Sequence, residues 1–285
     1  MSAEPASVAG TARPGAVRVA IAETFRSRAA AAALARDPTS VLARAPEVAG
    51  GRGLHRLLSE SEWGATVRVR PGHRGGLLGP LLGDRYATPA RPLREHALVE
   101  SLHADGLPVA TPVFAVAWRA GLGWRCAVAT VERENARDLA RVLRDEHSGS
   151  ERLRAARAVA RTLRRLHDAG VTHGDLQLRN LLVEPAEGTE DLVCVAIDFD
   201  RAHRGPALTP SARMKEWMRL VRSFDRTGHG AEITPRIEAT ALSVYCAGDR
   251  GLRQAMRACE PRERARIRRH RLGWRVRDRL FAPRR

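Results

Sequence analysis

The sequence predicts an α+β protein with two lobes, in which a small antiparallel β-sheet lobe precedes a mostly helical lobe. Between residues 46 and 133, short runs alternate apolar and polar side chains as strands do, and Gly-rich turns separate them. Between residues 134 and 249, apolar residues recur at the spacing of amphipathic helices. The length of 285 residues suits one two-lobed domain with a sizeable core.

Residues 1–45 are predicted to form an Ala-rich extension outside the two lobes. Val17–Ala35 is expected to be a helix that ends before Asp37 and Pro38, because proline cannot continue a helix. Met1–Gly15 has no basic stretch followed by an apolar run, so no secretory signal is expected. No apolar run in the sequence reaches the roughly 18 residues that a membrane span requires.

The first lobe is expected to begin with a hairpin whose turn holds Gly51, Arg52 and Gly53. Thr66–Arg70 then alternates as the third strand of this lobe. Because side chains alternate along a strand, Arg68 and Arg70 share one face and the valines between them share the other. If the valines pack under the following helix, the two arginines point to the opposite side.

That following helix is predicted over Arg91–Ala104, where apolar residues recur at helical spacing. Glu95 lies among the polar residues of this helix. A strand through Trp118 and a return strand to Val131 complete the antiparallel sheet. Thr130–Glu134 is the expected connection to the second lobe. This lobe contains predicted helices, of which the longest spans Glu151–Asp168 and another spans Ser211–Phe224.

Two short motifs in the second lobe indicate the chemistry. His173-Gly174-Asp175 is followed five residues later by Asn180, and Asp198-Phe199-Asp200 ends the apolar run Leu192–Ile197. This order and spacing match the catalytic loop and metal motif of protein-kinase-like phosphotransferases. Alone, an Asp after a Gly indicates a turn and an Asp after an apolar run indicates a cap. Together they predict a phosphotransferase with a protein-kinase-like fold.

Phosphoryl transfer explains why these residue types are needed. A carboxylate beside the attacking hydroxyl accepts or orients its proton, and Asp175 suits this role. Mg²⁺ prefers oxygen ligands, so the Asn180 amide and the Asp198 carboxylate are the predicted metal ligands. His173 is expected to be structural, a buried imidazole that braces the backbone of the loop.

The predicted ATP site draws on the first lobe. In kinases a Gly-rich turn covers the phosphates, and here that turn is the one with Gly51, Arg52 and Gly53. Kinases carry a phosphate-binding lysine on the third strand, but Lys215 is the only lysine of this chain. Arginine binds phosphate bidentately, so Arg70 is the first choice and Arg68 the alternative. Glu95 would hold the guanidinium, and the backbone around Glu132 would bind adenine.

The formal net charge is +17, so the expected partners are anionic. Residues 250–285, a predicted basic helical tail, hold fourteen arginines and three acidic residues. Such a segment suits nucleic acid or an anionic membrane surface, or it is a helix packed on the domain with a solvated basic face. The four cysteines are far apart without metal-binding spacing, which indicates reduced thiols in the cytoplasm.

From about Gly51 to Phe224 the chain resembles the lipopolysaccharide kinase family, and within it the kinases of 3-deoxy-D-manno-octulosonic acid (Kdo). The resemblance rests on the following residues: Gly51-Arg52-Gly53, Arg70 with Arg74-Gly75-Gly76, Tyr86, Arg91 with Glu95, Gly106-Leu107-Pro108-Val109, His173-Gly174-Asp175 with Asn180, Asp198-Phe199-Asp200-Arg201, and Trp217 with Arg219-Leu220-Arg222-Ser223. It implies ATP and Mg²⁺ as cofactors and transfer to the 4-hydroxyl of Kdo on lipid A. It also implies a cytoplasmic enzyme, peripheral on the inner membrane, whose partner is an anionic glycolipid rather than nucleic acid.

Two other functions stay open at this point. A phosphotransferase for an aminoglycoside or a homoserine-like alcohol would use the same loop, but its cationic substrates fit a basic protein poorly. A pseudokinase that binds a lipid or partner without catalysis would explain the missing lysine. The presence of Asp175, Asn180 and Asp198 together argues against the pseudokinase.

Overall fold

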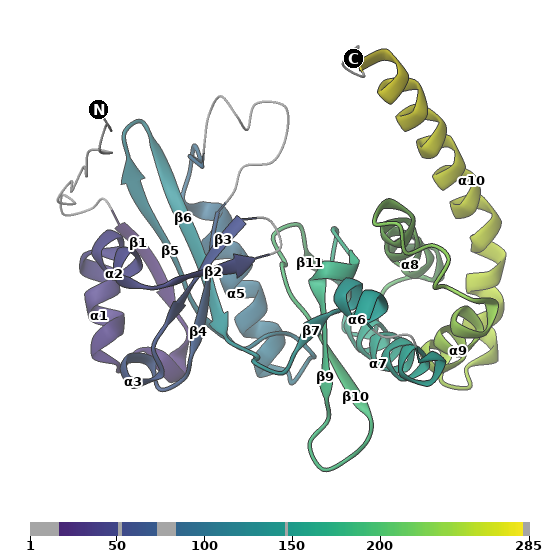
Figure 1. The fold of residues 1–285 in the computed structure, drawn as a ribbon, viewed down its shortest axis with the longest axis horizontal. Coiled ribbons are helices and arrows are strands. Elements are labelled where there is room, and N and C mark those ends of the chain that lie inside the picture. The colour runs from purple at the N-terminus through teal and green to yellow at the C-terminus, as the bar shows by residue number, and fades with distance from the viewer. Residues whose placement is uncertain (1–16, 51–52, 73–83, 146–147, 282–285) are drawn as a thin grey trace. The chain divides into compact units, whose positions relative to one another are not determined.

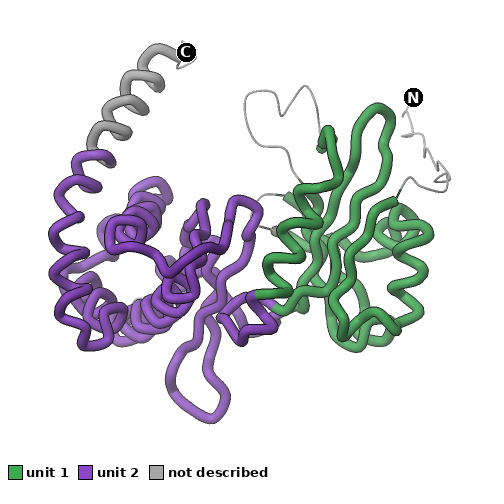
Figure 2. The backbone as a smooth tube through the Cα atoms, turned by 180° about the vertical axis from the view of Figure 1, so that it is seen from behind, with its two compact units in different colours: residues 1–101, 111–132 green, residues 102–110, 133–285 purple. Residues whose placement is uncertain are grey.

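A computed structural model of the chain describes residues 17–50, 53–72, 84–145 and 148–281, with the backbone alone for 267–281. It forms two compact units, shown in green and purple in Figure 2. Unit 1 contains residues up to 101 together with 111–132, and unit 2 contains residues 102–110 together with 133–285. The predicted division at residues 45, 133 and 249 stays a prediction.

Unit 1 is a six-stranded antiparallel sheet with short helices, as the fold prediction required (Figure 1). The strand order is β1-β5-β6-β4-β3-β2. The strands are β1 (Val17–Ile21), β2 (Glu47–Gly50), β3 (Gly53–Leu58), β4 (Val67–Pro71), β5 (Pro112–Ala120) and β6 (Gly123–Val131). The helices are η1 (Glu23–Phe25), α1 (Ala29–Arg36), α2 (Pro38–Arg44), α3 (Glu60–Trp63) and α5 (Ala90–Ala104), of which α5 continues into unit 2.

The prediction of one helix from Val17 to Ala35 was wrong in its first part. Val17–Ile21 forms strand β1, which pairs antiparallel with β5 at the edge of the sheet. The reason is local: this short stretch alternates β-branched residues with others, and such residues fit a pleated strand better than a helix. The Ala-rich part does form a helix, α1, and Asp37 then caps α2 by accepting a hydrogen bond from the Ser40 N–H at 3.1 Å.

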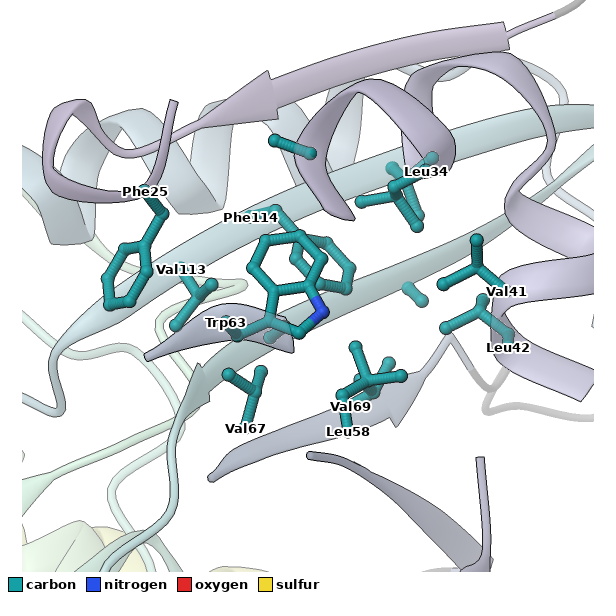
Figure 3. Packing of buried hydrophobic residues seen from close by; sticks show 14 of the residues in the cluster. Phe25, Leu34, Val41, Leu42, Leu58, Trp63, Val67, Val69, Val113 and Phe114 are labelled. Carbon is teal, nitrogen blue, oxygen red and sulfur yellow. The ribbon is translucent and has the colours of Figure 1, made fainter. Parts of the chain in front are cut away.

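The core of unit 1 is built around Trp63, which is fully buried and lies 5.1 Å from the ring of Phe114 (Figure 3). Leu34 of α1 packs into the same cluster, so the N-terminal segment completes this core. Val67 and Val69 also point into it. The valines of β4 therefore pack against the N-terminal helices and not under α5. Arg68 and Arg70 alternate with these valines, so they lie on the other face of the sheet, on the side of α5.

Unit 2 is mostly helical, again as predicted. Its helices are α6 (Leu139–Asp145), α7 (Gly149–Asp168), η2 (Leu178–Asn180), α8 (Pro210–Arg226), α9 (Pro235–Cys246) and α10 (Arg250–Phe281). Its strands are β7 (Arg137–Asp138), β9 (Leu181–Pro185) and β10 (Leu192–Ala196) in one small sheet, and β8 (Val171–Thr172) with β11 (His203–Arg204) in another. In the described ranges, no helix has an apolar stretch long enough to cross a bilayer.

The small sheet of unit 2 is anchored from both sides, which positions the loops at its ends. The hydroxyl of Thr162 on α7 donates to the carbonyl of Cys194 on β10 at 2.6 Å, in a buried contact. The N–H of Ala196 donates to the carbonyl of Pro108 at 2.9 Å, which ties residues 102–110 to unit 2. Strand β10 is therefore held in place directly before Asp198.

Candidate active site

The loop around Asp175 is held by a buried carboxylate. Glu216 of α8 is 1% exposed, and its Oε2 atom accepts the backbone N–H groups of His173 and Gly174 at 3.0 and 3.1 Å. Its other oxygen forms an ion pair with Arg219. A charged acceptor strengthens both hydrogen bonds, so the backbone directly before Asp175 is rigidly placed.

His173 has the structural role that its place in the motif suggested. Its ring is buried against Phe199, with centroids 4.9 Å apart, and Nε2 lies 3.0 Å from the carbonyl oxygen of Ile197, to which it donates. Burial lowers the pKa of His173, so the ring stays neutral and serves as a brace. It connects the loop with the strand end that carries Asp198.

Glycine is required at position 174. Gly174 has a φ of 77°, in the region that side chains disfavour, and a Cβ atom there would overlap the carbonyl oxygen of Arg201. The motif therefore contains Gly where protein kinases have Arg. The close approach of Arg201 packs the segment after Asp198 against the loop that holds Asp175.

Asn180 and Asp198 lie on neighbouring parts of unit 2 and offer the oxygens that Mg²⁺ requires. The Asn180 side-chain amide donates to the carbonyl oxygen of Asp175 at 2.9 Å, which orients its Oδ1 atom away from that contact. The Asn180 carbonyl accepts the N–H of Ile197 at 3.0 Å, one residue before Asp198. Asp198 itself has a φ of 67°. One carboxylate and one amide oxygen suit Mg²⁺, which takes its other ligands from water and nucleotide phosphates.

Unit 1 contains the predicted phosphate-binding arginines, each with a different partner. Arg70 Nη2 lies 2.6 Å from Oε1 of Glu95, which is 7% exposed on α5. Arg68 is paired bidentately with Glu132: Nη2 is 2.7 Å from Oε1, and Nε contacts Oε2. Because both N–H groups on the Nε/Nη2 edge of the Arg68 guanidinium are bound to the Glu132 carboxylate, Arg70 stays the first candidate for phosphate contact. The pair with Glu95 is the one that the kinase pattern predicted.

Glu132 was predicted to lie where backbone groups bind adenine. Its N–H donates to the carbonyl of Thr66 at 2.8 Å, so its carbonyl rather than its N–H is the group left to contact adenine. Gly53 begins β3 with a φ of 127° and pairs with Gly50 across the hairpin. The other predicted nucleotide contacts, Gly51 and Arg52, lie outside the described residues, as does Arg74-Gly75-Gly76 of the family motif.

Sequence reasoning missed Glu216, and it included Ser223 in the family motif without a role; both residues position the loop from α8. Ser223 accepts the N–H of Leu178 at 3.1 Å, in a buried contact. Glu216, Leu220 and Ser223 follow at spacings of four and three, so they lie on one face of the helix. A carboxylate within an otherwise apolar helix face was the available signal, but its backbone partners are 42 and 43 residues away in sequence.

We expect Glu216→Ala to destabilise the protein by about 3 kcal/mol, because it leaves the buried N–H of His173, the half-buried N–H of Gly174 and Arg219 without their carboxylate. Urea unfolding monitored by tryptophan fluorescence measures this change. Glu187→Ala, at an exposed position of the same unit, is the matched control and should change stability by less than about 0.5 kcal/mol. Equal effects of the two changes would show that Glu216 does not support the loop.

Known proteins of one family are similar to this chain in sequence. The model of the lipopolysaccharide kinase (Kdo/WaaP) family matches residues 47–245. A 3-deoxy-D-manno-octulosonic acid kinase of Haemophilus influenzae (strain 86-028NP) is 34% identical over 62% of this chain and 74% of its own length. Proteins of the same name from Xylella fastidiosa (strain M12) and Vibrio cholerae are 33% and 30% identical, over 69% and 72% of their lengths and 63% and 61% of this chain.

A solved structure supports the fold. The structure of WaaP in complex with acyl carrier protein is similar to this chain with a TM-score of 0.56 and 23% identity. The similarity covers 89% of this chain and 97% of that one. At this identity the likeness concerns the fold, which is the two-lobed, protein-kinase-like arrangement that the motifs predicted.

Proposed function

Because the chain belongs to the lipopolysaccharide kinase (Kdo/WaaP) family, and is thus a kinase that phosphorylates a sugar hydroxyl, we propose that it acts on the 4-hydroxyl of Kdo on lipid A. The phosphoryl donor is ATP. The observation that carries this proposal is the loop from His173 to Asn180, whose backbone is held by Glu216 beside the end of β10. The strongly positive net charge suits an acceptor with carboxylate and phosphate groups better than a cationic aminoglycoside.

The residues of unit 2 have distinct roles in this proposal. Asp175 orients the acceptor hydroxyl and takes its proton as the oxygen attacks the γ-phosphorus of ATP, while the bond from that phosphorus to the β,γ-bridging oxygen breaks and ADP leaves. Asn180 and Asp198 would hold Mg²⁺ through their side-chain oxygens. A metal ion bound there would supply positive charge that neutralises the phosphate oxygens. His173 keeps the two ligand-bearing segments in register through its contact with Ile197.

Arg70 is the proposed contact of unit 1 with the nucleotide phosphates. A guanidinium is always charged and can bind two phosphate oxygens, so it can replace the kinase lysine. Glu95 holds Arg70 and limits its rotamers before ATP binds. Arg68 and Glu132 form a separate pair beside it on the same strand face.

The direct test of the function is product analysis. The purified protein is incubated with ATP, Mg²⁺ and Kdo–lipid A, and the lipid is analysed by mass spectrometry. The expected product is heavier by one phosphate, and fragmentation places that phosphate on Kdo. NMR of the product then identifies the phosphorylated hydroxyl. A product with the added phosphate on lipid A would contradict the proposed acceptor. So would the absence of a phosphorylated lipid if the protein phosphorylates another sugar.

We expect Arg70→Ala to lower single-turnover transfer by roughly 100-fold, because it removes one or two charge-assisted hydrogen bonds to phosphate. Arg70→Lys should recover part of the activity, since lysine keeps the positive charge. The recovery should be incomplete, because lysine cannot bind two phosphate oxygens bidentately as a guanidinium does. Glu95→Ala should have a smaller effect in the same direction. The control is Arg68→Ala, which removes an arginine from the same face of β4. If Arg68→Ala abolished transfer and Arg70→Ala did not, the phosphate contact would be Arg68.

Helix α10 is the proposed membrane contact, since an enzyme that acts on lipid A must reach an anionic bilayer surface. Each arginine near such a surface contributes about 1 kcal/mol. We expect joint replacement of Arg275, Arg277 and Arg279 by glutamine to weaken sedimentation with phosphatidylglycerol vesicles by roughly 100-fold. Binding to phosphatidylcholine vesicles should be weak for both proteins. Unchanged binding to the anionic vesicles would exclude this part of α10 as the contact.

A further inference from the structure

A stripe of arginines follows α8 beside the loop that holds Asp175. Arg219, Arg222 and Arg226 are spaced by three and four residues, so their side chains lie along one side of the helix. The neighbouring face of the same helix holds the loop. Glu216 accepts the N–H of His173, and the hydroxyl of Ser223 accepts the N–H of Leu178. The stripe is therefore fixed with respect to the catalytic loop within unit 2.

Arg222 is the central member and has an unfavourable environment for a cation. Its side chain is half-buried, and burial together with the positive charges of Arg219, Arg226 and Arg266 lowers its pKa. Arg266 comes from α10, which packs on α8 (Figure 1). The acidic group that acts on Arg222 in the opposite direction is Asp175. The geometry agrees with this, because Ser223, the next residue of α8, accepts the N–H of Leu178, which is three residues after Asp175 in the same loop.

The neighbours of Arg222 have carboxylate partners of their own. Arg219 pairs with Glu216, and Arg266 Nη1 lies 3.9 Å from Oε2 of Glu263. Arg222 forms no hydrogen bond or ion pair with the residues that the structure describes. A partly desolvated arginine among other arginines gains most from an added anion, because the anion offsets both the lost hydration and the repulsion.

We propose that Arg222 binds the carboxylate of the acceptor sugar, with Arg219 and Arg226 adding to the attraction, while Asp175 engages the hydroxyl. This inference rests on the proposed function, since it names the group by which that acceptor is recognised. Kdo is a sugar acid whose carboxylate is attached to the ring carbon two positions from C4. One sugar can therefore present its hydroxyl to Asp175 and its carboxylate to a neighbouring cation. A lipid phosphate belongs to a different sugar of the glycolipid.

The test compares Arg222→Gln with the wild-type protein on three acceptors: Kdo–lipid A, the same lipid with the Kdo carboxylate converted to a primary amide, and the same lipid without its phosphates. Losing a charge-assisted hydrogen bond is expected to raise the acceptor KM of Arg222→Gln by about 10- to 100-fold on Kdo–lipid A. Converting the Kdo carboxylate to the amide should raise the acceptor KM of the wild-type protein by a similar factor. It should raise the acceptor KM of Arg222→Gln little further, because that variant has already lost the interaction with the carboxylate.

Two further variants keep the result interpretable. Arg236→Gln removes one exposed arginine from the first turn of α9 in the same unit and should leave the acceptor KM unchanged. Arg222→Lys keeps the charge without the fork and should fall between Arg222→Gln and the wild-type protein. Because Arg222 is surrounded by like charges, its replacement by glutamine should not lower the thermal unfolding midpoint.

The outcomes separate the inference from the function it rests on. An unchanged acceptor KM for Arg222→Gln, in a protein that phosphorylates Kdo–lipid A, overturns the role of Arg222 and leaves the function in place. A penalty for Arg222→Gln that persists on the amide and disappears on the lipid without phosphates assigns Arg222 to a phosphate and also overturns the inference. Absence of any phosphorylated Kdo with the wild-type protein overturns both.

Discussion

Replacing Asp175 with asparagine is expected to lower the rate of phosphoryl transfer by about 10²- to 10⁴-fold, the usual contribution of a positioned general base. Asparagine has nearly the same shape but cannot take the proton of the acceptor hydroxyl. The loop should keep its conformation, because Asn180 binds the backbone carbonyl of Asp175 and not its side chain. Glu216 likewise binds the backbone N–H groups of His173 and Gly174.

Single-turnover measurements with saturating ATP report the chemical step directly. The affinity for ATP, measured by thermal shift, should be nearly the same in Asp175→Asn and in the wild-type protein. Asp191→Asn, a carboxylate-to-amide change at an exposed position of the same unit, provides the control for an unspecific loss of charge. A rate within a few-fold of the wild-type value would remove Asp175 from the proton-accepting role.

Removing the carboxylate of Asp198 is expected to abolish transfer and to eliminate the thermal stabilisation by Mg²⁺ and ATP, because the charged ligand of the metal is lost. Asp198→Asn is the more informative variant. Asp198 has a φ of 67°, and asparagine tolerates this left-handed conformation whereas alanine would add about 1 kcal/mol of backbone strain. The comparison of Asp198→Asn with Asp198→Ala therefore separates loss of the ligand from loss of local stability.

Asn180→Ala should have a milder effect of the same kind, since a neutral amide is a weaker ligand than a carboxylate. It also removes the hydrogen bond to the Asp175 carbonyl, so its effect on the rate should exceed its effect on nucleotide affinity. The readout is the shift of the unfolding midpoint with Mg²⁺ and ATP, titrated for each variant. Full stabilisation of Asp198→Asn by Mg²⁺ and ATP would show that the metal is held by other residues.

The local patterns were sufficient for most elements. Alternation along Thr66–Arg70 predicted strand β4, helical periodicity predicted α5, α7 and α8 to within a few residues of their observed bounds, and the spacing of two motifs predicted the fold. These properties depend on neighbours in sequence, whose side chains repeat with the period of the element. Val17–Ile21 was misassigned because an Ala-rich continuation outweighed its three β-branched residues, and the strand with which this segment pairs, β5, lies about a hundred residues later.

The candidate site shows the same division between near and distant neighbours. The motif spacing identified Asp175, Asn180 and Asp198, because a metal and a reacting hydroxyl impose the same few residue types at short separations in any such loop. The kinase pattern also predicted that Glu95 would pair with a third-strand arginine, whereas the binding of Arg68 by Glu132 and the support of the loop by Glu216 depend on contacts between segments 64 and 42 residues apart. No periodic pattern encodes such pairs, because which charges meet depends on how β4, α5 and α8 pack after the chain has folded.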